Sequence, residues 1–263
     1  FRPAGSRAIR PGADGWETAV LLTERWSATG ERVDALLEQL TPGLPGQERA
    51  RAQHLFFGVV RWLSRLEAGL AGLMARAPRT KVRASLAVAG YEILEAGPDS
   101  AAQIVHHAVE RAKKVASIKE AGLINAVARK LAVKLAAPAE GLAAEFAHPD
   151  WLVQRWAGQF GAEATRALLA WNQQPAPVYA RWRDAAATPP DYFAPSRWPG
   201  FFEVRSGHWE EVRRLAQAGT IYLQDPSTRR CIELLAPAAG ETILDACAAP
   251  GGKSLLIADT MGS

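Results

Sequence analysis

The stretch from Thr242 to Leu256 constrains the fold of this 263-residue chain more than any other. Residues 242–247 are mostly apolar and partly β-branched, which predicts a buried parallel strand. A turn with two adjacent glycines follows at 248–252, and helical spacing resumes from 253 to 260. A strand, a glycine-rich turn and a helix form the first unit of a nucleotide-type α/β sheet. Such a unit places a ligand against the N-terminus of the helix.

This turn has the properties of a main-chain cradle for an anion. Gly251 and Gly252 lack a Cβ atom, so a ligand can approach the backbone, and Pro250 fixes one φ angle. Lys253 places a cation beside the free N–H groups that open the helix, which suits a carboxylate or a phosphate. The spacing is not that of a Walker loop, because Cys247 takes the place of its first glycine. A glycine-rich turn with a purely structural role remains open as the alternative.

The composition is that of a folded protein with room for two domains. Hydrophobic residues make up 48% of the chain, which is enough for real cores. No apolar run reaches the roughly 18–20 residues of a membrane span. The segment Phe1–Arg10 lacks the apolar core of a signal peptide, and the missing initiator Met suggests that the numbering starts inside a longer chain.

The cysteines and histidines argue against a disulfide framework and a metal site. Cys231 and Cys247 are the only cysteines, which indicates a reducing cytoplasm. His106 and His107 are adjacent, and adjacent helical residues point apart by about 100°, so the two cannot hold one metal. No other His or Cys has zinc-site spacing. Cys231 lies in a helical stretch, and we expect it to serve in packing.

The net charge of +4 is unevenly distributed. Residues 1–137 contain 20 Lys and Arg against 13 Asp and Glu, a net charge of +7, whereas residues 138–263 carry a net charge of −3. The first half is therefore the predicted surface for a polyanion such as RNA, with an ordinary solvated basic face as the alternative. The candidate phosphate contacts in this half are Lys113, Lys114, Lys119, Arg129 and Lys130.

Residues 1–137 show helical periodicity and no strand pattern, so we predict an all-α bundle. Asp14 is the predicted N-cap of the first helix. The predicted helices cover residues 16–28, residues 31–40, one long helix with an apolar stripe from Leu55 to Leu73, a helix capped by Thr80, residues 101–115 and residues 117–136.

Residues 138–235 are predicted to form a small α+β subdomain. A helix over 151–171 precedes strand-like segments at 178–182, 201–205 and 221–224, with a helix at 209–218 and a loop-rich stretch at 187–199. Arg181 and Arg183 are expected to be exposed on the first strand, either as contacts to an RNA backbone or as plain surface charge.

Several segments together resemble the Sun/Fmu (RsmB-like) family of RNA cytosine-5 methyltransferases. The string Ile243–Ser254 resembles the first S-adenosylmethionine motif of that family. Three segments resemble the N-terminal NusB-like domain of that family, namely Arg49–Trp62, Ile104–Lys114 and Ala121–Lys130. Three further segments resemble the entry into its catalytic region, namely His148–Arg155, 172–175 and Gln224–Thr228. The chain departs from the family at Tyr179–Arg183, where the family often has a strand rich in Arg and Asn.

The resemblance implies a multidomain fold with three parts. These are a NusB-like helical RNA-binding domain over 1–137, an α+β bridging subdomain over 138–235, and the start of a Rossmann-like methyltransferase domain over 236–263. It implies S-adenosylmethionine as cofactor and ribosomal RNA of the 16S type as partner, for a cytoplasmic monomer with no membrane or metal. The implied cofactor loop consists of Cys247, Ala248, Ala249, Pro250, Gly251, Gly252 and Lys253.

The resemblance also implies that no catalytic residue lies in this chain. Cys247 is near a helix N-terminus, where a thiolate is favoured, but its position belongs to the cofactor loop. In the family, a cysteine thiolate adds to C6 of cytosine so that C5 can take the methyl group. The motifs that carry that nucleophile are absent up to Ser263, so we expect them beyond it and expect the fragment to be inactive. The alternative is a NusB-like RNA-binding or protein-interaction adaptor with a vestigial methyltransferase segment.

Overall fold

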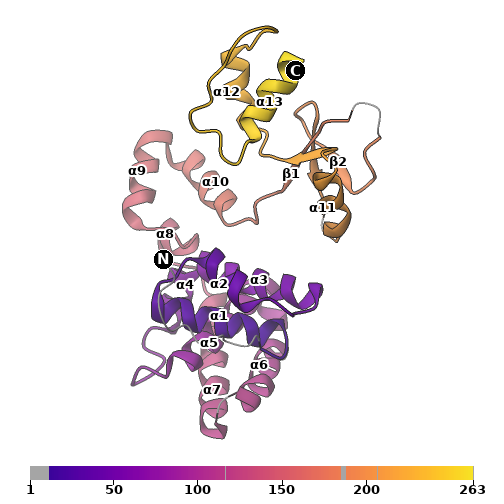
Figure 1. Ribbon diagram of the computed structural model, residues 1–263. Coiled ribbons are helices and arrows are strands. Elements are labelled where there is room, and N and C mark those ends of the chain that lie inside the picture. The colour runs from indigo at the N-terminus through magenta and orange to yellow at the C-terminus, as the bar shows by residue number, and fades with distance from the viewer. Residues whose placement is uncertain (1–11, 116, 185–187, 206, 263) are drawn as a thin grey trace. The chain divides into compact units, whose positions relative to one another are not determined.

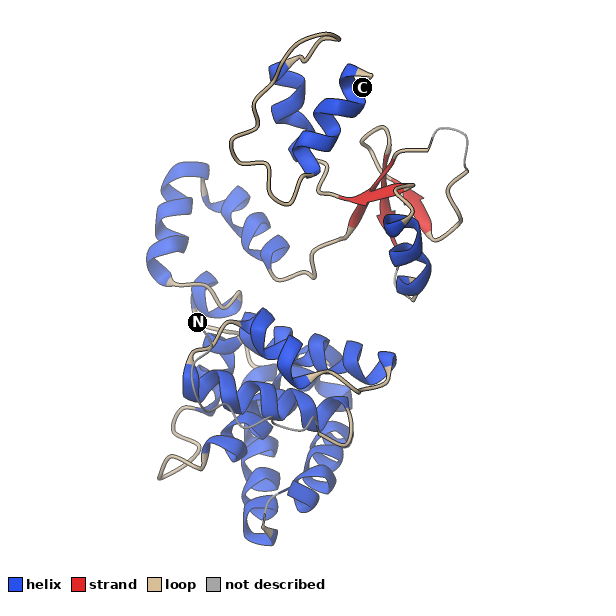
Figure 2. Cartoon of the chain, viewed as in Figure 1, coloured by secondary structure: helices blue, strands red, loops and turns tan. Residues whose placement is uncertain are grey.

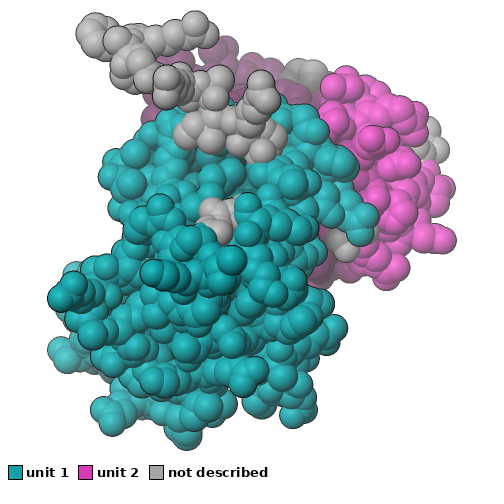
Figure 3. Space-filling view, turned by 90° about the horizontal axis from the view of Figure 1, so that it is seen from below, with its two compact units in different colours: residues 1–174 teal, residues 175–263 magenta. Residues whose placement is uncertain are grey.

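The computed structural model describes residues 12–115, 117–184, 188–205 and 207–262, and the basic segment at 1–10 lies outside them. The chain divides into two compact units, residues 1–174 and 175–263, which Figure 3 shows in different colours. The first unit is helical, and the second combines a small antiparallel sheet with helices (Figure 2). The predicted multidomain fold with a helical first part is confirmed. The finer division at residues 137 and 235 stays a prediction.

The first unit contains ten α-helices among its described residues, and capping side chains begin two of them. Asp14 caps the first helix as predicted, because its side chain accepts a hydrogen bond from the N–H of Glu17 at 2.8 Å. Ser117 and Glu120 form a capping box before α7. The helices are α1 Gly15–Thr29, α2 Val33–Leu40, α3 Gly46–Arg61, α4 Leu63–Leu70, α5 Thr80–Ala96, α6 Ala101–Val115, α7 Ile118–Ala136, α8 Gly141–Glu145, α9 Asp150–Phe160 and α10 Ala162–Asn172, with a 3-10 turn at Pro98–Ser100.

Three predicted helix boundaries are wrong. The long helix through Leu73 is interrupted at Trp62, whose backbone (φ −99°, ψ 12°) separates α3 from α4. The helix over 151–171 is interrupted by Gly161, which ends α9 with a φ of +80° that glycine adopts at no steric cost. Thr80 does not cap α5 but is its first helical residue, and Arg79 precedes it without a side-chain cap.

The main core of the first unit is one cluster of apolar side chains from α1 and from α3 to α7. Trp16 is completely buried in it, and its indole N–H donates to Glu92 Oε2 at 2.8 Å, so the polar group of this ring is satisfied. From α7, Ile124 and Leu131 are completely buried in the same cluster. Because the inner faces of α6 and α7 are fixed in this core, the two helices lie side by side with their outer faces in solvent (Figure 1).

The second unit is built on a four-stranded antiparallel sheet in the order β2–β3–β1–β4. Its register places Arg181 of β1 opposite Phe201 of β3 and Tyr222 of β4. Three of the strands match the predicted segments, whereas β2 lies in the stretch predicted to be a loop. The elements are β1 Tyr179–Trp182, β2 Phe193–Pro195, β3 Phe201–Val204, α11 Trp209–Gln217, β4 Ile221–Leu223, α12 Thr228–Leu235 and α13 Gly252–Met261.

The sheet has two unlike faces, because successive side chains of a strand point to opposite sides. Ala180 and Ile221 lie on one face and pack with Val212 of α11 in an apolar cluster. The side chains that alternate with them carry polar groups and reach the C-terminal segment; they are Arg181, Arg183, Tyr222 and Gln224. This polar face positions the candidate site.

Residues 242–247 do not form the predicted buried strand. They have no strand conformation, and Leu244 is 88% exposed. A strand requires a neighbour for its backbone hydrogen bonds, and no described segment pairs with 242–247. The helix predicted from Lys253 is present as α13. The glycine-rich turn is therefore held by contacts other than a sheet of its own.

Candidate functional site

The glycine-rich loop, residues 247–253, is closed by the side chain of Asp245. Its Oδ1 accepts a hydrogen bond from the N–H of Cys247 at 3.1 Å, and its Oδ2 accepts one from the Ser254 hydroxyl at 2.7 Å. Gly251 has a φ of +107°, a conformation that residues with a Cβ atom rarely adopt. The carboxylate thus joins the start of the loop to the first turn of α13. Between them, Gly251 has no side chain to cover the backbone.

Two side chains of β4 and its extension hold the loop against the sheet. Tyr222 Oη donates to the carbonyl oxygen of Pro250 at 3.2 Å, and Gln224 Nε2 donates to that of Gly252 at 3.1 Å. A Cβ atom on Gly252 would lie 2.9 Å from a ring carbon of Tyr222. The close approach therefore requires glycine at position 252, and the sheet sets the position of the loop.

Arg181 and Arg183 extend from the same face and meet at Asp259 of α13. Asp259 accepts from Arg183 Nε at 3.0 Å and Nη2 at 2.8 Å, and it also forms an ion pair with Arg181. Arg181 Nε donates to Gln224 Oε1 at 3.0 Å, which links this network to the loop. The hydrogen bonds from Arg183, opposed by desolvation and reinforced by Arg181, hold the pKa of Asp259 at about 2. The carboxylate is therefore ionised at neutral pH and fastens α13 to the sheet.

These positions correct two interpretations of the sequence. The expectation that Arg181 and Arg183 are exposed on the first strand is wrong. Arg181 is 6% exposed, because its guanidinium lies between Gln224 and Asp259, and Arg183 is half-buried just after β1. The expectation that Cys231 serves in packing is also wrong, since it is an exposed free cysteine, as is Cys247. The assignment of Arg181 and Arg183 as RNA contacts stays a prediction, as does the assignment of residues 247–253 to a cofactor.

Sequence reasoning missed four residues that hold the site together, namely Tyr222, Gln224, Asp245 and Asp259. Gln224 and Asp245 lie inside the segments that carry the family resemblance, so the sequence places them near the loop but does not indicate that they hold it. Tyr222 and Gln224 are two residues apart, so their side chains lie next to each other on the same face of the strand. The pairing of β4 with β1, which brings them to the arginines, is a long-range contact that no local pattern encodes.

The predicted RNA contacts of the first unit lie on α6 and α7. These two helices contain seven Lys and Arg against two Glu, a net charge of +5. Lys113 pairs with Glu110 at 2.6 Å, whereas Lys114, Lys119 and Lys130 are exposed and form no ion pair among the described residues. The arrangement suits phosphate groups, which attract Lys and Arg without regard to base sequence.

Sites of two other kinds are absent from the described part of the chain. No three His, Cys, Asp or Glu side chains within residues 12–115, 117–184, 188–205 and 207–262 are grouped as the ligands of a metal ion would be. None of the helices in these ranges is both long and apolar enough to cross a membrane.

We expect Gly252→Ala to displace the glycine-rich loop, because the new methyl group would meet the Tyr222 ring. The amide of Leu255 bonds the Gly251 carbonyl at 2.9 Å and reports on the start of α13. Its hydrogen exchange should become at least about tenfold faster. Adding Tyr222→Leu should restore part of the protection by making room for the methyl group. Unchanged exchange in the single variant would mean that the sheet does not set the loop.

Comparison with known proteins matches two consecutive regions of this chain to family models. Residues 17–133 match the NusB family, and residues 148–195 match the ferredoxin-like domain of RsmF/B-like methyltransferases. The first match covers α1 to α7 apart from the ends, and the second runs from the loop before α9 to β2. The order of the two matches is the order that the sequence resemblance implies.

Curated relatives of similar sequence carry the name ribosomal RNA small subunit methyltransferase B. The protein of Serratia proteamaculans is 31% identical over 242 residues, and that of Cronobacter sakazakii is 32% identical over 249 residues. The protein of Citrobacter koseri is 31% identical over 250 residues. Each alignment covers 86% of this chain and 56% of the relative, so the chain spans little more than half the length of the relatives it matches.

Proposed function

We propose that this chain, which belongs to the RsmB-like (Sun/Fmu) family, carries the RNA-binding and loop-supporting portion of a ribosomal RNA methyltransferase that acts on C5 of cytosine. Its first unit contains the NusB-family region, and the RsmF/B-like region continues into the sheet of the second. The named relatives support ribosomal RNA as the substrate. S-adenosylmethionine is the proposed methyl donor.

The observation that carries this proposal is the attachment of the glycine-rich loop to the sheet. The loop has the sequence that resembles the first cofactor motif of the family. The strand whose side chains hold it follows the RsmF/B-like region, the last part of which, residues 175–195, lies in the same unit as that strand. The φ of Gly251 and the close approach of Tyr222 to Gly252 favour glycine at both positions, and an exposed main chain before a helix N-terminus is what an anion cradle needs.

The residues of the loop fit the methionine end of the proposed cofactor. The N–H groups of the first turn of α13 are free of intrahelical partners, and Lys253 is exposed beside them, so both can attract the carboxylate of that end. Gly251 leaves the main chain open to the ligand. When bound, S-adenosylmethionine supplies an electrophilic methyl group. The role of this chain is to hold and orient one end of it, with Asp245, Tyr222 and Gln224 as positioning residues.

The first unit is proposed to hold the RNA through α6 and α7. Replacing both Lys113 and Lys114 by Gln should weaken binding of ribosomal RNA and lower the slope of log affinity against log salt by about 1–2, because fewer counterions are released. Fluorescence anisotropy over a series of salt concentrations measures both quantities. As a control, Arg49→Gln with Arg76→Gln removes the same charge from two exposed positions of this unit. Equal effects of the two pairs would contradict the assignment to α6.

The activity itself is tested with the full-length protein that contains this chain. Incubation with methyl-labelled S-adenosylmethionine and small-subunit ribosomal RNA should transfer label to the RNA. A protein that binds RNA in a salt-dependent manner but transfers no label is an RNA-binding adaptor with a vestigial methyltransferase segment. A protein that does neither is a protein-interaction module of NusB type.

A further inference from the structure

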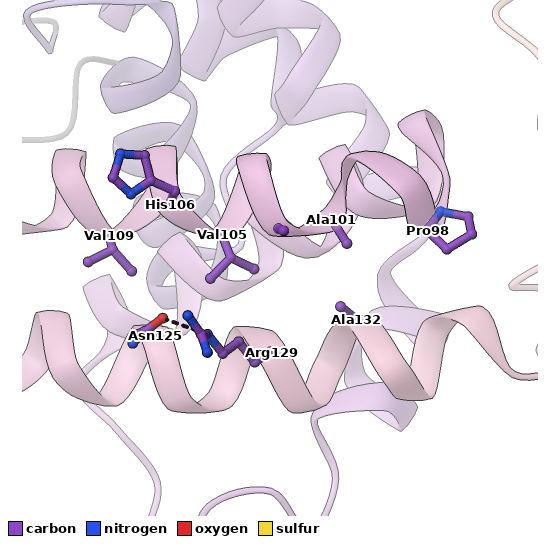
Figure 4. A pocket seen from close by; sticks show the side chains of 9 residues that line it. Pro98, Ala101, Val105, His106, Val109, Asn125, Arg129 and Ala132 are labelled. Carbon is purple, nitrogen blue, oxygen red and sulfur yellow. Dashed lines mark hydrogen bonds between the residues drawn. The ribbon is translucent and has the colours of Figure 1, made fainter.

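An open groove lies between α6 and α7 on the solvent side of the helical unit. Its volume is about 560 Å³, within the range of small-ligand sites. Figure 4 shows Val105 and Val109 pointing from α6 toward α7, with Asn125 and Arg129 on the facing side of α7. Small side chains keep the groove wide; they are Ala101, Ala102 and Ala132. The groove thus has an apolar floor and a polar edge on α7, and His106 of α6 also lines it.

The polar edge presents hydrogen-bond donors. Arg129 Nε donates to Asn125 Oδ1 at 3.2 Å, which engages one lone pair of the amide oxygen and holds both side chains in place. The Asn125 amide nitrogen and the two terminal nitrogens of Arg129 make no hydrogen bond to any described residue, so they remain available as donors. Among the described residues, no carboxylate lines the groove. A ligand at this edge must therefore offer acceptors.

The positive charge around the groove favours a nucleic acid over other ligands that fit an apolar groove. The net charge of +5 on α6 and α7 complements phosphate groups, and three exposed lysines on these helices have no ion-pair partner among the described residues. A base that is stacked in a duplex could not enter a groove of this kind, whereas an unpaired base can be splayed onto a protein surface. A purely apolar peptide would make no use of the positive charge of α6 and α7, whereas the phosphates of RNA would.

We propose that this groove binds an unpaired guanine of the RNA. The base would lie on Val105 and Val109, and the Arg129 fork would donate to its O6 and N7, which are adjacent acceptors. Adenine presents a donor beside N7, and cytosine presents a donor in the place of O6, so neither matches the two donors of the Arg129 fork. Lys114 and Lys119 would attract the flanking phosphates. This inference rests on the proposed RNA-binding function and adds a base preference to it.

The test compares two neighbouring residues that carry the same charge. Arg129 lines the groove, whereas Lys130 is exposed and does not line it. The full chain is titrated with a single-stranded uridine 12-mer and with the same oligomer carrying one central guanosine. We expect the wild type to prefer the guanosine oligomer at least about fivefold, since a good bidentate contact discriminates by that much or more. Arg129→Gln should abolish the preference for guanosine. Lys130→Gln should weaken the binding of both oligomers equally and leave that preference unchanged.

A second pair of variants tests the groove without changing charge. Ala102→Phe puts a ring at the exposed rim of the groove and should reduce the preference, whereas Gln103→Phe adds the same ring beside the lining and should not. Circular dichroism should show both folded, because both positions are exposed. Binding of both oligomers with equal affinity, or equal effects of Arg129→Gln and Lys130→Gln, would overturn the guanine site while leaving RNA binding intact. Absence of binding to any RNA would overturn the proposed function as well.

Discussion

Replacing Asp259 by Asn lowers the free energy of unfolding of the second unit by about 2–4 kcal/mol, because a charge pair is broken at a largely buried guanidinium. Asp259 is the common partner of Arg181 and Arg183, and the Arg181 side chain is only 7% exposed. An amide oxygen at position 259 can still accept hydrogen bonds, but it carries no charge that could neutralise two cations. The buried guanidinium of Arg181 then keeps neutral partners such as Gln224 but loses its charged one.

The same carboxylate gives the wild type a pH dependence with a defined sign. Its pKa is about 2 in the folded chain, against an ordinary value of 3.8. The folded state therefore binds this proton less tightly than the unfolded state does. The stabilisation is complete above about pH 4 and is lost as the pH falls from about 4 to about 2. In Asp259→Asn this part of the acid sensitivity should be absent.

Urea unfolding read by pulsed hydrogen exchange measures the effect on the second unit separately from the first. Peptides from β3, β4 and α13 report on the sheet and on its contact with α13. Glu210→Gln is the control, since Glu210 is an exposed carboxylate of α11 that forms no ion pair among the described residues. A change below about 0.5 kcal/mol for Asp259→Asn, the range of an ordinary surface substitution, would mean that the network does not stabilise the unit.

Gly58→Ala should destabilise the helical unit by about 3 kcal/mol, although alanine is the better helix former. A Cβ atom at position 58 of α3 would lie 2.1 Å from two ring carbons of Tyr91 on α5. Tyr91 is buried, and its hydroxyl donates to Glu95 Oε1 at 3.0 Å, so the ring cannot turn aside without losing that bond. The clash must then be relieved by separating two core helices.

Thermal and urea unfolding of the helical unit measure this loss. Gly122→Ala on α7 is the matched control, because a Cβ atom there meets no described atom within 4 Å. It should stabilise the helix by about 0.5–1 kcal/mol. Tyr91→Leu should rescue Gly58→Ala in part, so that the double variant is more stable than the sum of the two single effects predicts. Strict additivity would show that the ring and the glycine do not compete for the same space.

The helical unit was largely predictable because its signals are local. Apolar side chains that recur every three or four residues define α1 to α7, and the caps at Asp14 and Ser117 lie where short-range hydrogen bonds need them. The sequence indicates the interruption at Gly161, because a glycine within a helical pattern is a common helix end. The one at Trp62 did not, since a tryptophan is an ordinary helical residue and only its observed backbone angles show the break.

The site was only half predictable, because its support comes from long-range contacts. The glycine-rich loop could be identified from consecutive residues. The strand predicted at 242–247 rests on its apolar and β-branched residues, and such a segment becomes a strand only when another strand pairs with it. The expected exposure of Arg181 rests on the usual behaviour of arginine. Its burial depends on Asp259, which is 78 residues away in the sequence.

Methyl transfer to C5 of cytosine can be followed through the hydrogen that this carbon loses. The full-length protein containing this chain is incubated with unlabelled S-adenosylmethionine and small-subunit ribosomal RNA that carries tritium at C5 of its cytosines. Methyl transfer to C5 displaces that tritium, so we predict that tritium is released into water in equal amount to the methyl groups gained by the RNA. Methyl transfer without tritium release would place the methyl group at another atom, and the absence of both would contradict the assignment of this chain to a methyltransferase.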